Sequence, residues 1–132
     1  MNPLGILWYF LPAFVANMTP VFVRRVRLLD TPVDFGVKFH GERLLGEHKT
    51  WRGLAFGVLA GTLIFLLQQC VVVPFALFDY QQMPWILGAL LSSGALLGDL
   101  LKSFIKRRIH IKPGTSWYGF DQIDYIVGGL VF

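Results

Sequence analysis

The sequence predicts an all-α, polytopic integral membrane protein. Of its 132 residues, 55% are hydrophobic and only 15% are charged, whereas soluble domains carry charge on about a quarter of their residues. Residues 1–23, 54–78 and 80–98 contain no charged side chain. About 20 apolar residues cross the hydrocarbon core of a bilayer, so each run is long enough for a membrane-spanning helix. Three such runs cannot all be buried core helices of one small soluble domain.

We expect one transmembrane domain over residues 1–132, with full helices at about 4–23, 54–78 and 85–105 and a partial fourth helix at 121–132. The fourth helix has room for only about ten residues, or roughly 15 Å, which is half a bilayer. A helix that ends in mid-membrane leaves its last carbonyl groups without donors. The sequence therefore predicts a chain that is truncated within its fourth helix.

The basic residues predict the orientation. Seven of the 12 Lys and Arg lie between Arg24 and Arg52, and the other five lie between Lys102 and Lys112. Such residues accumulate in cytoplasmic loops, so the sequence predicts two basic cytoplasmic loops and an N-terminus outside the cell membrane. Because both segments lie against a membrane, their charge is no evidence for nucleic acid as a partner.

Two features inside the apolar runs concern packing. Asn17 lies in the first run with Pro12 and Pro20, and the prolines predict a kinked or broken helix whose freed polar groups face protein or water. The alternatives for Asn17 are a hydrogen bond to a neighbouring helix and a functional role. Small residues also recur at four-residue spacing, as in Gly57 and Gly61, which lets helices approach closely within a bundle or in a homodimer.

The first basic loop has the ingredients of a phosphate-binding site. It holds three glycines, two arginines and a Lys-Thr pair ahead of a predicted helix: Gly41, Gly46, Gly53, Arg43, Arg52, Lys49 and Thr50. Glycine lets backbone amides approach an anion, and a helix N-terminus adds a favourable dipole. It is not a P-loop, because Glu47 and His48 separate the second glycine from the lysine. The alternative is a solvated loop whose basic residues orient the protein and bind lipid headgroups.

The third apolar run ends in a carboxylate, Asp99. A charge at a helix centre in the membrane costs about 2.5–3.5 kcal/mol, and less near the interface, so such a residue is a candidate for function. Ser103 lies one turn beyond Asp99, and Arg107 lies one turn beyond Ser103. Lys106 follows Lys102 by the same spacing. The helix thus places an acid, a hydroxyl and cations along adjoining faces.

Two further carboxylates, Asp121 and Asp124, begin the expected fourth helix. With Asp99 they would place three acids beside basic residues at one membrane face. Carboxylates and phosphate oxygens together bind Mg²⁺, while Lys and Arg neutralise phosphate charge, so the set predicts transfer at phosphorus. The alternative pairs Asp99 with Lys102 or Lys106, and leaves the other two acids as ordinary residues of a helix N-terminus.

These motifs resemble a known family. The stretch 103–107, Lys112 after four residues, and the stretch 119–124 are similar to the signature of CDP-diacylglycerol synthases. The CDP-archaeol synthase family is a closer match. It is similar in Pro12-Ala13, Ala16-Asn17, Pro20, Asp34-Phe35-Gly36, Gly46, Lys49-Thr50-Trp51-Arg52-Gly53 and Gly98-Asp99. The resemblance covers nearly the whole chain in order, although Gln122 stands where the diacylglycerol enzymes have arginine.

The resemblance implies a Mg²⁺-dependent cytidylyltransferase of phospholipid biosynthesis. Such an enzyme condenses CTP with a lipid phosphate, either an archaeal-type ether lipid phosphate or phosphatidic acid, and releases pyrophosphate. By motif position, Asp99, Asp121 and Asp124 would bind the metal, and Asp99, Asp124 and Lys106 would be catalytic. The substrate-binding residues would be Asn17, Asp34, Arg43, Lys49, Thr50, Arg52, Ser103, Arg107 and Lys112.

Two alternative functions remain open at the level of sequence. A CTP-dependent lipid kinase would use similar binding groups but transfer the γ-phosphate to a lipid alcohol. A chain with half a fourth helix could also be an inactive remnant or a small lipid-binding membrane protein. The lipid tails are not specified, because isoprenoid and fatty chains would both meet only apolar helix faces.

Overall fold

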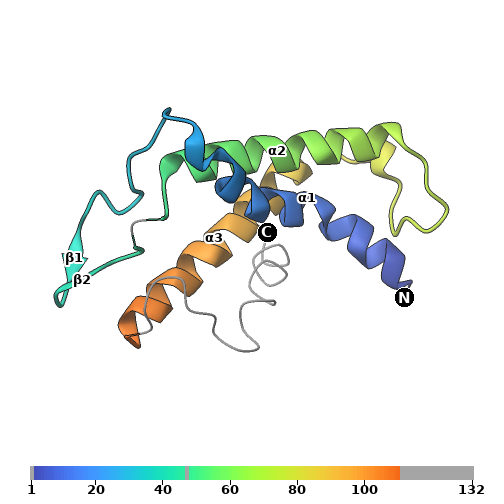
Figure 1. Cartoon of the computed structure of the whole chain (residues 1–132). Coiled ribbons are helices and arrows are strands. Elements are labelled where there is room, and N and C mark those ends of the chain that lie inside the picture. The colour runs from blue at the N-terminus through green and yellow to red at the C-terminus, as the bar shows by residue number, and fades with distance from the viewer. Residues whose placement is uncertain (1, 47, 111–132) are drawn as a thin grey trace.

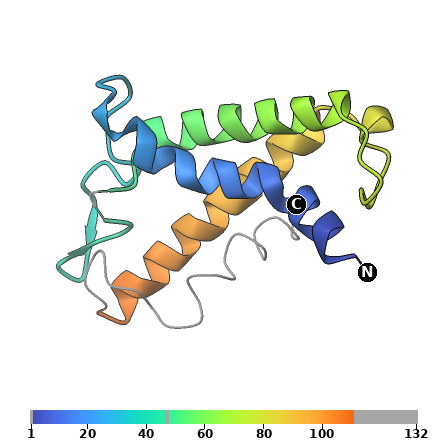
Figure 2. The same ribbon diagram turned by 45° about the vertical axis from the view of Figure 1, so that its right-hand side comes forward.

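The computed structural model describes residues 2–46 and 48–110. Three long helices form its body: α1 (Pro3–Phe22), α2 (Trp51–Cys70) and α3 (Ile86–Arg108). Each is long and apolar enough to cross a membrane, as the sequence predicted. The first two helices lie side by side, and α3 crosses them obliquely (Figure 1, Figure 2).

Two connections join the helices at opposite ends of the bundle (Figure 1). The first contains the 3₁₀ helix η1 (Val23–Arg25) and an antiparallel hairpin of β1 (Lys38–Phe39) and β2 (Glu42–Arg43). The second contains the 3₁₀ helix η2 (Tyr80–Gln82). The hairpin was not predicted, because strands of two residues are too short to show an alternating pattern. The predicted fourth helix lies outside the described residues.

The second helix begins at Trp51, three residues earlier than predicted. Thr50 is its N-cap, and the Thr50 hydroxyl accepts a hydrogen bond from the backbone N–H of Gly53 at 3.3 Å. Arg52 lies inside the first turn although the sequence placed it in a charged loop. Its guanidinium is 3.0 Å from the Asp30 carboxylate, so its charge is satisfied at the start of an apolar helix.

The same helix ends at Cys70, eight residues before its predicted end. Val71 already has an extended backbone, with φ −117° and ψ 121°. Three consecutive β-branched valines, the last of which precedes Pro74, disfavour further helix. In contrast, α3 continues to Arg108, because the basic residues of its last turn interact favourably with the helix C-terminus.

The three helices meet at Gly61 of α2. A Cβ atom there would lie 2.0 Å from the Ser92 hydroxyl of α3 and 2.7 Å from the Pro12 carbonyl of α1. One turn away, a Cβ at Gly57 would lie 2.9 Å from the Ala16 carbonyl. Small residues allow such close approach in lipid. The glycine spacing predicted to serve packing is therefore used inside this bundle.

The first helix is continuous across Pro12, so the break that the sequence allowed there is absent. Proline has no N–H, so the Trp8 carbonyl one turn earlier loses its partner within the helix. The side-chain amide of Gln68 in α2 donates to that carbonyl, and Gln68 is 1% exposed. An unsatisfied carbonyl in hydrocarbon costs several kcal/mol. This hydrogen bond therefore keeps Pro12 within a spanning helix and ties α1 to α2.

The loop between α1 and α2 is organised around a buried acid. The Asp34 carboxylate accepts hydrogen bonds from the N–H groups of Gly36 at 3.0 Å and Leu45 at 3.2 Å, and it pairs with Arg43 at 3.0 Å. Burial raises the pKa of Asp34. The hydrogen bonds and the charge of Arg43 together lower it by more, so its pKa lies below the ordinary value. Two residues predicted to contact substrate thus bind each other.

The hairpin is attached to the C-terminal end of α3 (Figure 1). The Arg108 guanidinium donates to the carbonyls of Phe39 at 3.1 Å and Arg43 at 3.4 Å. His110 Nδ1 lies 3.1 Å from a carboxylate oxygen of Glu42. These contacts connect the loop that follows α1 to the helix that carries Asp99.

The substitution Gly61→Ala tests the packing of the helix crossing. The added methyl group must displace the Pro12 carbonyl and the Ser92 hydroxyl, so we expect a loss of about 1–3 kcal/mol in stability from overpacking. Thermal unfolding in detergent, followed by circular dichroism, measures the change. Leu59→Ala, at an outward position that is 59% exposed, is the control and should have a smaller effect. Equal unfolding temperatures for Gly61→Ala and the unaltered protein would contradict this packing.

The substitution Asp34→Asn tests the organisation of the loop. An amide cannot accept all three hydrogen bonds, so we expect a loss of about 1–3 kcal/mol and faster amide exchange over residues 34–46, measured by mass spectrometry. Glu42→Gln, at a more exposed acid of the same loop, should change exchange less.

The same carboxylate predicts an acid dependence of the loop. Because the folded pKa of Asp34 lies below 3.8, its contribution is fully present above about pH 4 and is lost as the pH falls through the lowered pKa. This part of the pH dependence of stability should be absent from Asp34→Asn. An unchanged profile of stability against pH in that variant would show that Asp34 is not its source.

Candidate active site

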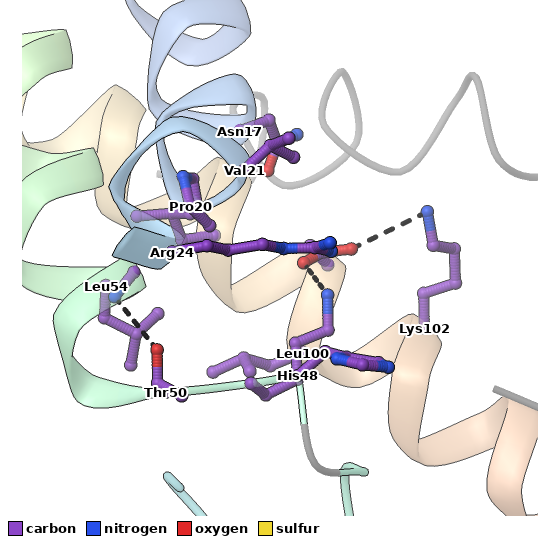
Figure 3. Close-up of a pocket in the computed structure, with 13 residues that line it drawn as sticks. Asn17, Pro20, Val21, Arg24, His48, Thr50, Leu54, Leu100 and Lys102 are labelled. Atoms are coloured by element: carbon purple, nitrogen blue, oxygen red, sulfur yellow. Dashed lines mark hydrogen bonds and ion pairs between the residues drawn. The ribbon is translucent and has the colours of Figure 1, made fainter. Parts of the chain in front are cut away.

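A cavity of about 310 Å³ opens at the end of the bundle where the two basic segments meet (Figure 3). Its lining comes from the end of α1, the start of α2 with the residues before it, and the middle of α3. The lining residues are Asn17, Pro20, Val21, Arg24, His48, Lys49, Thr50, Gly53, Leu54, Leu96, Asp99, Leu100 and Lys102. The cavity thus brings together four residues that the sequence assigned to the site: Asn17, Lys49, Thr50 and Asp99.

Asp99 is the centre of charge in this cavity. Lys49 pairs with one of its carboxylate oxygens, and Lys102 Nζ lies 3.7 Å from the other. Arg24 extends its guanidinium into the same space (Figure 3). The side chains of Lys49 and Asp99 are 26% and 23% exposed, so solutes can reach both. Among the described lining residues, three cations therefore accompany one carboxylate, and the excess positive charge favours phosphate.

The start of α2 is fixed against the preceding loop. The Lys49 carbonyl accepts the Val33 N–H at 2.8 Å, and the Trp51 N–H donates to the Thr31 carbonyl at 3.1 Å. The next N–H, of Arg52, donates to a loop carbonyl at 2.9 Å. The first-turn amides are thus already bonded, so this helix end could attract an anion only through its dipole. The backbone cradle that the glycines suggested is not formed here, and side chains of the cavity would bind the phosphate.

Six other predicted residues lie away from the cavity lining. Asp34 and Arg43 bind each other inside the loop. Arg52 pairs with Asp30 and donates to the Val26 carbonyl. Ser103 is buried one turn beyond Asp99, and Lys106 and Arg107 follow in the last turn of α3. The predicted residues Lys112, Asp121 and Asp124 lie outside the described residues.

The oxygen donors of the cavity fit a hard cation. Asp99 supplies a carboxylate, Asn17 an amide and Thr50 a hydroxyl. Within residues 2–46 and 48–110, no group of three or more His, Cys, Asp or Glu could hold a metal ion. Mg²⁺ is commonly bound through one or two carboxylates and the phosphates of a substrate. This donor set therefore suits Mg²⁺ that arrives with a nucleotide.

Arg24, His48 and Lys102 line the cavity (Figure 3), but no motif in the sequence predicted a binding role for them. Arg24 and Lys102 were attributed to membrane orientation or to pairing with Asp99. Two signals could have identified Arg24 and Lys102. Arg24 is the first charge after the uncharged run of α1, and Lys102 follows Asp99 by three residues on one helix face.

Comparisons with known proteins agree with this architecture. The family model CarS-like, CDP-archaeol synthase, matches residues 3–132. The CDP-archaeol synthase of Pyrococcus furiosus is 40% identical over 100% of this chain and 76% of its own length. That of Thermococcus gammatolerans is 42% identical over 96% and 71%. That of Methanocaldococcus jannaschii is 41% identical over 96% and 72%.

The fold is also similar to a solved structure. This is an intramembrane enzyme for archaeal membrane lipids biosynthesis, with a TM-score of 0.81 and 36% identity. The match covers 98% of this chain and 76% of the solved one. The helical membrane architecture predicted from the sequence is thereby confirmed. The chain belongs to the CDP-archaeol synthase family, as the resemblance of its motifs indicated.

Proposed function

We propose that this protein transfers the cytidylyl group of CTP to a membrane lipid phosphate of the archaeal ether type, which yields a CDP-lipid and pyrophosphate. The observation that carries the proposal is the electropositive cavity between three membrane helices. A triphosphate and a lipid phosphate are both anions, so such a cavity concentrates both reactants at the membrane. The relatives named CDP-archaeol synthases support the same reaction.

The reaction needs positioning and charge stabilisation more than covalent catalysis. An oxygen of the lipid phosphate attacks the α-phosphorus of CTP, the bond from this phosphorus to the bridging oxygen breaks, and pyrophosphate leaves with the electron pair. No protein nucleophile is required, because the lipid phosphate is an anion at neutral pH. Lys49, Lys102 and Arg24 would neutralise the phosphate charge that develops in the cavity. Asn17 and Thr50 would add polar contacts to the same substrates.

Asp99 would hold Mg²⁺ here, joined by Asp121 and Asp124 according to their motif positions. The ion would supply charge neutralisation and polarisation at the phosphoryl oxygens. Lys49 and Lys102 currently neutralise the Asp99 carboxylate. Release of Lys49 from that pair would free its ammonium group for a phosphate oxygen. Lys106 and Arg107 remain proposed phosphate contacts, although the described cavity lining does not include them. Lys112, which lies outside the described residues, remains a proposed contact by its motif position.

The orientation is part of the proposal. Lys49 belongs to the first basic segment and Lys102 to the second, and both lie beside Asp99. The two segments are thus at one end of the bundle, which we assign to the cytoplasm, where CTP is available, with the N-terminus outside. A homodimer would need surfaces other than those of Gly57 and Gly61, which are buried against α1 and α3.

The reaction is tested with labelled CTP. Purified protein in liposomes receives Mg²⁺, a panel of lipid phosphates and lipid alcohols, and CTP labelled at either the α- or the γ-phosphorus. We expect lipid-extractable label from the α position alone, in a product derived from a lipid phosphate. Label from the γ position alone would identify a lipid kinase and exclude cytidylyl transfer.

Variants test the assigned residues. Removal of one preorganised charge contact lowers turnover by about 10²–10³-fold, so we expect that loss for Lys49→Gln and Asp99→Asn. Asp124→Asn should abolish turnover without unfolding the protein. Lys38→Gln, which removes a charge from the same loop outside the cavity, is the control and should stay within about twofold. Normal activity in Asp124→Asn would contradict its role in metal binding.

A further inference from the structure

The loop between α1 and α2 exposes many large apolar side chains. Six of them, within residues 26–39, are at least 40% exposed: Val26, Leu28, Leu29, Phe35, Val37 and Phe39. Three exposed basic residues lie among or beside them: Arg25, Arg27 and Lys38. We refer to these nine residues as the loop patch. Large apolar side chains exposed in this number along one loop point to an interaction with a protein or a membrane.

Aromatic contacts hold the loop patch at the level of the helix ends. The ring of Phe35 lies 6.2 Å from that of Trp51, the first residue of α2. On the other side, the Arg108 guanidinium lies 5.0 Å from the ring centre of Phe39 and 5.3 Å from that of Phe104 in α3. The ends of spanning helices lie near the membrane–water interface. In a membrane spanned by α2 and α3, this placement would set the loop near the bilayer surface.

The exposed charge of the loop patch is positive. In the described part of this loop, the acids are paired within the chain. Asp30 binds Arg52, Asp34 binds Arg43, and Glu42 contacts His110. The basic residues of the loop patch are exposed. The loop thus offers cations and apolar side chains together, which is the combination that binds anionic membranes.

We propose that the loop patch docks on the surface of the host bilayer, with its apolar side chains among the lipids near the headgroups and its cations against anionic headgroups. This interaction goes beyond the proposed reaction and does not depend on it. The charge and the level of the loop favour a lipid surface over a second copy of the chain. Docking would also seat the loop that carries Lys49 beside the headgroup layer.

A fluorescent probe on the loop tests this proposal. In a Cys70→Ser background, Val37→Cys is labelled with an environment-sensitive dye, and Thr31→Cys is the matched polar position on the same loop. Each protein is placed as a single copy in nanodiscs of phosphatidylcholine with or without phosphatidylglycerol. We expect blue-shifted emission at position 37, quenching by a lipid with a nitroxide just below its headgroup, and protection from iodide. The probe at position 31 should stay more accessible to iodide.

Charge removal tests the contribution of the headgroups. Each cation near an anionic surface strengthens association by about fivefold. The double substitution Arg25→Gln and Arg27→Gln should therefore weaken docking of the labelled loop by up to about 25-fold. The weakening is measured as an increase in the quenching of the probe by iodide. Equal iodide quenching at positions 37 and 31 in both lipid mixtures would overturn the proposal. A blue shift seen only in discs that hold two copies would instead identify contact between copies and also overturn it.

Discussion

The fold depends on the close crossing of three helices at Gly61. Apolar side chains gain little from meeting each other in lipid, so helices associate there through tight packing and satisfied polar groups. The crossing supplies the packing, and the Gln68 amide supplies the hydrogen bond that Pro12 cannot. From this point the same helix faces continue for about two turns, or roughly 11 Å, and reach the cavity at Pro20, Gly53 and Asp99. The helix crossing therefore sets the relative positions of the residues that line the site.

The loop and α3 are joined by charge as well as by packing. A carboxylate near the hydrocarbon edge is costly unless it is paired, and Asp99 has Lys49 from the loop and Lys102 from its own helix. At the far end of the loop, Arg108 attaches the hairpin to the same helix. The position of the loop over the cavity is thus fixed at two places on α3. Each place uses a cation whose partner is distant in sequence.

The sequence predicted most of the fold because charge-free runs and glycine spacing report directly on spanning helices and their contacts. It also predicted that Lys49 and Asp99 serve one site, and both line the cavity. Helical spacing shows which residues share a face of a helix, but it does not show how far along the helix a cavity extends. Ser103 shares the face of Asp99 and yet lies a turn beyond the cavity. Composition also could not show that Asp34 is buried by its own loop.

The glycine-rich loop illustrates how composition and geometry can diverge. Glycines ahead of a helix suggested free amides for a phosphate, but the amides of Trp51 and Arg52 already donate to loop carbonyls. Gly36, Gly41 and Gly46 instead have positive φ values of 78°, 85° and 94°, which glycine adopts without steric cost. They turn the loop back on itself. Anion binding is thereby left to the cationic side chains of the cavity, which reach it from α1, α3 and the loop.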